Sequence, residues 1–128
     1  MPTAITQGLK VSVITQYQEQ HSNPAVQHFV FAYRIRIENT SDFTVKLLRR
    51  HWMITDSNGQ KHEVEGEGVI GQQPLLEPGQ VHSYTSGTSF SSPIGKMNGT
   101  YLMERIVDGH HFNISIPEFV LTAPFKLN

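Results

Sequence analysis

The sequence contains no cysteine, which excludes a disulfide framework, a thiolate metal site and a cysteine nucleophile. It also lacks an excess of either charge: ten basic and eleven acidic residues give a formal net charge of −1, which argues against a nucleic-acid partner. No apolar run approaches the roughly 18 residues of a membrane-spanning helix. Residues 1–10 show no charged segment followed by an apolar one, so no secretory signal is visible. We therefore expect a cytoplasmic protein without a membrane or nucleic-acid partner.

Helical periodicity is missing as well, whereas alternation of apolar and polar residues recurs along the chain. The clearest alternation covers residues 29–38, and a change of parity predicts a β-bulge at 48–50. Strands are predicted at 9–17, 29–38, 45–54, 61–65, 81–86, 101–107, 112–116 and 119–125. About seven short strands at this spacing predict an all-β fold. The expected architecture is an antiparallel β-sandwich of the immunoglobulin or fibronectin type III kind, as one domain spanning 1–128.

The connections between these strands carry their own predictions. Asn58-Gly59 and Asp108-Gly109 predict hairpins with type I′ turns. The Ser-, Gly- and Pro-rich stretch Gly87–Gly99 predicts a long loop. Residues Phe119–Phe125 follow a proline and predict an edge strand, which would allow a homodimer by pairing between chains.

A glycine loop, Gly66–Gly71, matches the pattern GxGxxG. A dinucleotide site of the Rossmann type is not expected, because Pro74 and Pro78 stop the helix that such a site needs. Two interpretations remain open. The loop amides would form an anion nest, or the glycines would permit positive φ where the chain changes sheets. The candidate ligand-binding residues of this loop are Gly66, Gly68, Gly71 and Glu67.

Three carboxylates precede or enter this loop at a spacing of two residues. On a regular strand Glu63, Glu65 and Glu67 share one face, where they would hold a hard cation such as magnesium, or a borderline metal if a histidine such as His62 joined them. The candidate metal ligands are Glu63 and Glu65. The alternative is a solvated strand face whose charges keep an edge soluble.

Two arginines, Arg49 and Arg50, lie beside Trp52, the only tryptophan. Trp and Arg are enriched in interaction hot spots, so the two arginines are a candidate interaction surface. The alternative is that Trp52 anchors the core, with one arginine beside it and the other solvated. The serines show no nucleophile-elbow context, and no catalytic set is visible, so we expect neither enzyme activity nor a cofactor.

A series of short motifs in one order resembles the ApaG family over nearly the whole chain, from about Leu9 to Pro124. The motifs are Arg50-His51-Trp52-x-Ile54-Thr55-Asp56, Asn58-Gly59, Val64-x-Gly66-Glu67-Gly68-Val69-Ile70-Gly71-x-Gln73-Pro74, Leu76-x-Pro78-Gly79, Tyr84-Thr85-Ser86-Gly87, Gly95-x-Met97-x-Gly99-x-Tyr101-x-Met103 and Ile116-Pro117-x-Phe119. The resemblance implies a fibronectin type III-like sandwich and the stand-alone bacterial form of the family.

The family is associated with cobalt and magnesium resistance and, by gene neighbourhood, with diadenosine tetraphosphate hydrolysis. Similar eukaryotic domains occur in a polymerase-delta-interacting protein and in F-box proteins, and no catalytic residues carry over. The resemblance therefore implies a protein-interaction module acting through the glycine loop and the Gly87–Gly99 loop, with an unknown protein partner. Two alternatives are kept: a small-ligand module for a divalent cation or a phosphate-containing nucleotide, and a hydrolase of nucleotide polyphosphates.

Overall fold

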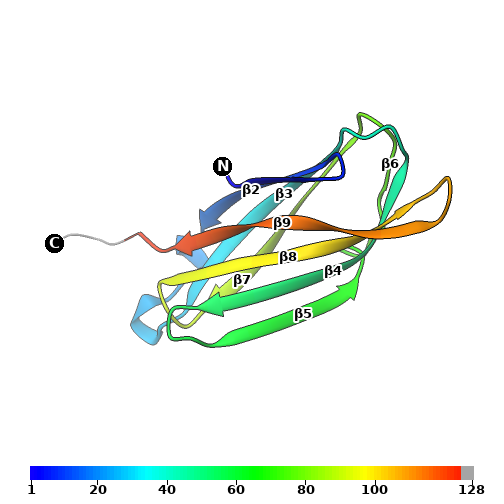
Figure 1. Ribbon diagram of the computed structural model, residues 1–128. Coiled ribbons are helices and arrows are strands. Elements are labelled where there is room, and N and C mark those ends of the chain that lie inside the picture. Colours follow the sequence, from blue (N-terminus) through cyan, green and yellow to red (C-terminus); the bar gives the residue numbers. More distant parts are fainter. Residues whose placement is uncertain (125–128) are drawn as a thin grey trace.

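The computed structural model describes residues 1–124 and shows two antiparallel sheets packed face to face (Figure 1). The first sheet has the order β1 (Thr3–Thr6), β2 (Leu9–Tyr17), β3 (Phe29–Asn39), β7 (Val81–Phe90). The second has the order β5 (Lys61–Glu67), β4 (Val45–Asp56), β8 (Ile94–Arg105), β9 (His110–Thr122), and β6 (Leu75–Leu76) also pairs with β4. Two short 3₁₀ turns, η1 (Glu19–His21) and η2 (Pro24–Val26), join β2 to β3. The predicted all-β antiparallel sandwich is confirmed.

None of the helical segments in residues 1–124 has the length and apolar character needed to cross a membrane.

The core lies between the sheets because each strand turns alternate side chains inward. Along β3, Phe29, Phe31 and every second residue up to Ile37 are buried, as the alternation predicted. Tyr33 of the first sheet packs edge-on against Trp52 of β4, with ring centroids 5.5 Å apart, and Phe119 of β9 lies 5.9 Å from Trp52. Trp52 is therefore a core anchor that joins the two layers.

Strands β4 and β9 each contain a β-bulge, which lets their apolar side chains face the core on both sides of the bulge. The register between β4 and β8 shifts between Leu47 and Arg49, which confirms the predicted bulge. A second shift sets Met97 and Gly99 of β8 opposite Phe119 and Ile116, so that β9 carries one extra residue beside Pro117. The proline lies in the outermost strand of its sheet, where its missing N–H is tolerated. The predicted edge strand is thus the second half of β9, and Phe125 lies outside the described residues.

The predicted long loop Gly87–Gly99 is wrong. Residues 87–90 continue β7 and residues 94–99 begin β8, so only Ser91–Pro93 connect them. Glycines in these strands serve close packing: a Cβ on Gly95 would lie 2.5 Å from the Phe90 ring, and one on Gly99 would lie 2.1 Å from the carbonyl oxygen of His51. The short strand β1 was not predicted, and it pairs with β2 along Leu9–Ser12.

The two predicted hairpins exist, but their turns are not type I′. That turn needs positive φ at both central residues, whereas only Gly59 and Gly109 adopt positive φ. The connections span residues 57–60 and 106–109. Aspartate side chains stabilise them instead, since Asp56 Oδ1 accepts a hydrogen bond from the amide of Asn58 and Asp108 Oδ1 accepts one from the amide of His110.

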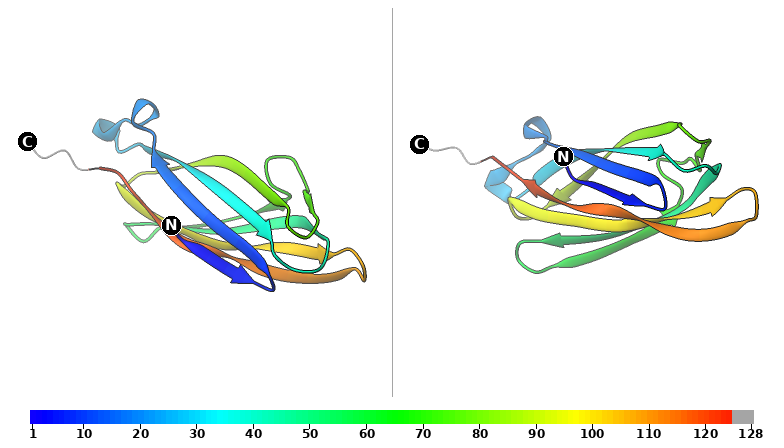
Figure 2. Two further views of the ribbon diagram at one scale, coloured as in Figure 1. Left: turned by 90° about the horizontal axis from the view of Figure 1, so that it is seen from above. Right: turned by 45° about the horizontal axis from the view of Figure 1, so that its top comes forward.

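The sandwich is closed along one side and open along the other. On the closed side β1 and β2 contact β9, and the Ser115 amide donates to Thr6 Oγ1 at 3.2 Å. On the other side the outer strands are β7 and β5, and the loop between β5 and β6 lies near the start of β7 (Figure 2). The open side therefore gives solvent access to the space between the layers.

Candidate functional site

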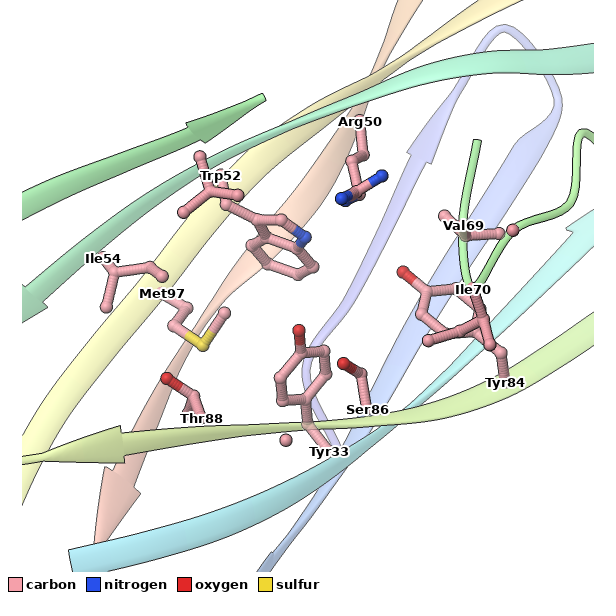
Figure 3. A pocket seen from close by; sticks show the side chains of 13 residues that line it. Tyr33, Arg50, Trp52, Ile54, Val69, Ile70, Tyr84, Ser86, Thr88 and Met97 are labelled. Atoms are coloured by element: carbon pink, nitrogen blue, oxygen red, sulfur yellow. The ribbon is translucent and has the colours of Figure 1, made fainter. Parts of the chain in front are cut away.

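A cleft of about 410 Å³ lies on the open side, and residues of both sheets line it (Figure 3). Its apolar walls consist of Trp52, Ile54, Val64, Val69, Ile70 and Met97. Its polar lining consists of Arg50, Tyr33, Tyr84, Ser86 and Thr88. A hollow of about 650 Å³ at the other end of the sandwich is lined mainly by proline and aromatic side chains, with no basic group among its described lining residues. The cleft is thus where a charged group and apolar walls meet.

Arg50 supplies the positive charge of the cleft. The bulge in β4 turns its side chain inward, where Nη1 donates to the carbonyl oxygens of Glu67 at 3.0 Å and Gly68 at 3.1 Å. None of the ion pairs among the described residues includes Arg50. The guanidinium is half-buried and held by neutral carbonyls, and no carboxylate of residues 1–124 forms an ion pair with it.

Tyrosine hydroxyls converge near this charge. Tyr84 of β7 and Tyr101 of β8 are hydrogen-bonded to each other through their hydroxyls and so connect the two sheets. Burial raises the pKa of Tyr33, and burial raises the pKa of Tyr84 and Tyr101 well above the ordinary value. All three phenols therefore stay protonated at neutral pH, and a phenol in this state can donate a hydrogen bond.

The glycine loop forms one wall of the cleft. Gly68 and Gly71 adopt positive φ, as does Ile70 between them, which confirms the conformational interpretation at two of the three glycines. Gly66 belongs to β5 and has no positive φ; a Cβ there would lie 2.8 Å from Arg50 Nη1, so this glycine makes room for the guanidinium. The chain does not change sheets here, because β6 still pairs with β4.

The loop amides are largely used within the fold. Gly68 donates to Leu48 O, while Val69 and Gln72 exchange hydrogen bonds with each other. Of the predicted ligand-binding residues, Gly71 lines the cleft directly, Gly66 and Gly68 support Arg50, and Glu67 contributes its backbone carbonyl. The structure therefore brings the predicted residues around a side chain, Arg50, rather than around free amides.

The predicted carboxylate face lies on the outside of the second sheet. Glu63 and Glu65 approach His51 of β4: Nε2 of His51 contacts Glu63 Oε1 and lies 3.6 Å from Glu65 Oε1. One ligand atom from each of the three residues lies within 4.8 Å of the others. Glu67 lies opposite Arg49 instead. The histidine beside the carboxylates is His51 rather than His62. The register of the hairpin around Asn58 indicates this, because it places His51 opposite Glu65.

The two arginines of the predicted interaction surface point in different directions. Arg50 faces the cleft, whereas Arg49 is exposed on the outer face of the second sheet near His51 and Glu65. Adjacent residues on a strand take opposite faces, so the two side chains diverge, although both arginines line a shallow hollow beside His51 and Glu65. The two nevertheless provide a matched comparison of a cleft arginine with a surface arginine.

The comparisons with known proteins agree along the chain. The model of the ApaG domain, DUF525, matches residues 19–105. Protein ApaG of Paramagnetospirillum magneticum is 49% identical over 126 residues, which cover 98% of this chain and 96% of that protein. Protein ApaG of an Azoarcus species is 45% identical over the full length of both. A crystal structure of an ApaA protein from Bordetella pertussis is similar with a TM-score of 0.88 and 43% identity, covering 98% of each chain.

Proposed function

This chain belongs to the ApaG domain family, and we propose that it is a non-enzymatic binding module that holds an anionic group of its ligand beside Arg50 in the cleft. The observation that carries the proposal is the half-buried guanidinium, which is fixed by two backbone carbonyls and has no described carboxylate partner. A phosphate or carboxylate binding there would form a charge-assisted hydrogen bond that the folded chain itself leaves unmade.

The rest of the cleft supports binding rather than catalysis. The hydroxyls of Tyr33 and Ser86, which are hydrogen-bonded to each other, lie in the cleft below Arg50, and the apolar walls would hold the remainder of a ligand. The described lining contains no histidine, aspartate, glutamate, lysine or cysteine that would serve as a general base or a nucleophile. These features favour a recognition role over hydrolysis of the ligand.

The principal ligand in this proposal is a protein partner, reached through the glycine loop and the mouth of the cleft. Ile70 at the tip of this loop is 61% exposed although it is a large apolar residue at the mouth. Val64, which also lines the cleft, is 39% exposed, so the two residues form an apolar rim beside the charge, as is typical of protein contact sites. A phosphate-containing nucleotide is the alternative ligand, since its phosphate would use the same guanidinium.

An NMR titration tests the anion site with orthophosphate, acetate and diadenosine tetraphosphate as probes. We expect saturable shifts of the Arg50 Nε–H and of cleft amides, and a loss of affinity of about tenfold or more in Arg50→Gln, because a charge-assisted bond is removed. Arg49→Gln is the matched control, since Arg49 lies outside the cleft and its replacement should leave binding unchanged. Absence of saturable shifts with all three probes would overturn the proposal, as would equal losses in both variants.

A second candidate function rests on the cluster of His51, Glu63 and Glu65. One imidazole and two carboxylates within 4.8 Å suit a borderline divalent ion such as cobalt better than magnesium, which prefers oxygen ligands. His51 also contacts each of the two carboxylates without any metal. Titration with Co²⁺ followed by visible absorption tests the candidate: Glu63→Gln should abolish a wild-type cobalt band that Glu67→Gln leaves intact. A wild-type chain that shows no cobalt band would remove this candidate.

A further inference from the structure

Strand β7 ends the first sheet, and within residues 1–124 no strand pairs with its outer edge. It pairs with β3 over ten residues without any shift of register, from Val81 opposite Glu38 to Phe90 opposite Phe29. No other described strand pairs with it, and no described loop places a backbone hydrogen bond on its free edge. In an antiparallel strand about half of the N–H and C=O groups point away from the neighbour, so β7 presents a row of free donors and acceptors.

The other outer strands carry features that prevent edge-to-edge pairing, and β7 does not. The strand β5 is charged at Lys61, Glu63, Glu65 and Glu67. The strand β9 contains Pro117 with a bulge, and β1 is only four residues long. Charge, proline, bulges and short length are the usual protections of sheet edges. The ten residues of β7 include no Lys, Arg, Asp, Glu or Pro.

The unprotected edge borders the cleft. Tyr84, Ser86 and Thr88 are the alternate residues of β7 that face inward, and all three line the cleft with Arg50. A strand added beside β7 would follow the same pleat, and every second side chain of that strand would face the cleft. An acidic side chain at such a position would reach the region of the unpaired guanidinium.

We propose that β7 accepts an extended segment of a partner protein as an additional strand, with an acidic side chain of that segment directed into the cleft toward Arg50. The proposal rests on the proposed anion site and names its ligand class. Strand addition supplies affinity through main-chain hydrogen bonds, while a pocket that accepts one side chain supplies specificity. Here the main-chain bonds would come from β7 and the specificity from Arg50.

Charge complementarity favours a partner segment over a second copy of this chain. Two β7 strands paired about a twofold axis would bring hydroxyls and His82 to the cleft, and neither would neutralise the guanidinium. A segment with a single Asp or Glu between β-branched residues would provide both the ladder and the counter-charge.

Selection from a display library of short randomised peptides on the wild-type chain tests the proposal. We expect enriched peptides to alternate β-branched residues and to carry one acidic residue at a fixed position. Amide shifts on adding such a peptide should follow Val81–Phe90, and amides of β7 should gain protection from hydrogen exchange. A version of the peptide with alternate backbone nitrogens methylated should lose about tenfold or more in affinity, because it keeps the carboxylate but lacks the ladder donors.

The remaining outcomes separate this inference from the anion site. If the methylated peptide binds as well as its parent, and shifts stay at Arg50 and the glycine loop, strand addition is overturned while the anion site stands. If peptides bind along β7 equally in wild type and in Arg50→Gln, the acidic side chain is overturned as the determinant. If no peptide is enriched although orthophosphate shifts the cleft amides, only the strand-addition inference falls. If neither orthophosphate nor any peptide binds, both proposals fall.

Discussion

The guanidinium of Arg50 lies where a side chain on residue 66 would begin, since a Cβ on Gly66 would be 2.8 Å from both terminal nitrogens of that arginine. The first glycine of the GxGxxG pattern therefore serves a cation of this chain rather than the phosphate of a dinucleotide. Gly68 and Gly71 have a different role, because their positive φ values shape the turn that follows. One pattern thus combines two separate requirements of the fold.

Gly66→Ala should move the Arg50 side chain and lower the affinity for orthophosphate nearly as much as Arg50→Gln does. The contact that would change is the far end of a flexible side chain, and Gly66 has no positive φ, so we expect a loss of only about 1–2 kcal/mol in stability from the displaced hydrogen bonds. Phosphate titration and thermal denaturation check both parts. Gly59→Ala is the control, since it introduces strain at positive φ far from the cleft and should leave phosphate binding unchanged. Unaltered binding in Gly66→Ala would contradict the role assigned to this glycine.

Gly99→Ala should destabilise the fold by about 3 kcal/mol or more, because the new Cβ would lie 2.1 Å from the His51 carbonyl oxygen and only backbone movement relieves that contact. Gly87→Ala provides the comparison within the same kind of element. Its Cβ would meet only Phe31 O at 3.4 Å, so the change in unfolding free energy should stay below about 1 kcal/mol. Chemical denaturation of the two variants measures the difference, and equal stabilities would show that β4 and β8 are less closely packed than described.

The hydroxyl pair of Tyr84 and Tyr101 should show coupling in a double-mutant cycle. Tyr84→Phe leaves the fully buried Tyr101 hydroxyl without its partner and should lower stability by about 1–3 kcal/mol. Removing both hydroxyls should lower the free energy of unfolding by less than the sum of the two single changes, because no unpaired hydroxyl is then left in the core. Denaturation of the three variants gives the coupling free energy. Simple additivity would mean that the two hydroxyls do not depend on each other.

Asp108 should make stability depend on pH in the acidic range. Hydrogen bonds from Arg105 hold the pKa of this carboxyl at about 2, below its ordinary value of 3.8. A carboxyl with a lowered pKa in the folded state stabilises the fold above its unfolded pKa and loses that contribution as pH falls from 3.8 toward about 2. Asp108→Asn should therefore lose less stability across this window than the wild type. An NMR titration of the Asp108 carboxyl in Arg105→Gln should show a higher pKa, and an unchanged pKa would contradict the assigned cause.

Much of the sandwich is predictable from local patterns. The alternation at 29–37 identifies the inward face of β3, and the parity change after Leu47 locates the bulge. The prediction of a loop at 87–99 is wrong because serine, threonine and glycine favour turns in isolation, whereas here Gly95 and Gly99 provide the close approach that Phe90 and His51 require. Propensity cannot report a contact whose partner lies far away in the sequence.

The candidate site was only partly predictable for the same reason. The proximity of His51, Glu63 and Glu65 follows from the register of one hairpin, so it can be predicted from the local sequence. The cleft needs Tyr33, Arg50 and Ser86 on three strands from two sheets, and nothing in the separation of these residues along the chain reveals that they meet. The pairing of layers, rather than any motif, brings the charge and the hydroxyls together.

The closed side of the sandwich also has a mechanical consequence. With the layers joined where β1 and β2 meet β9, a small rotation of one sheet about that side produces a larger change of width at the far side. The hydrogen bond between the hydroxyls of Tyr84 and Tyr101 joins β7 to β8 across the two layers, so it opposes such a change of width.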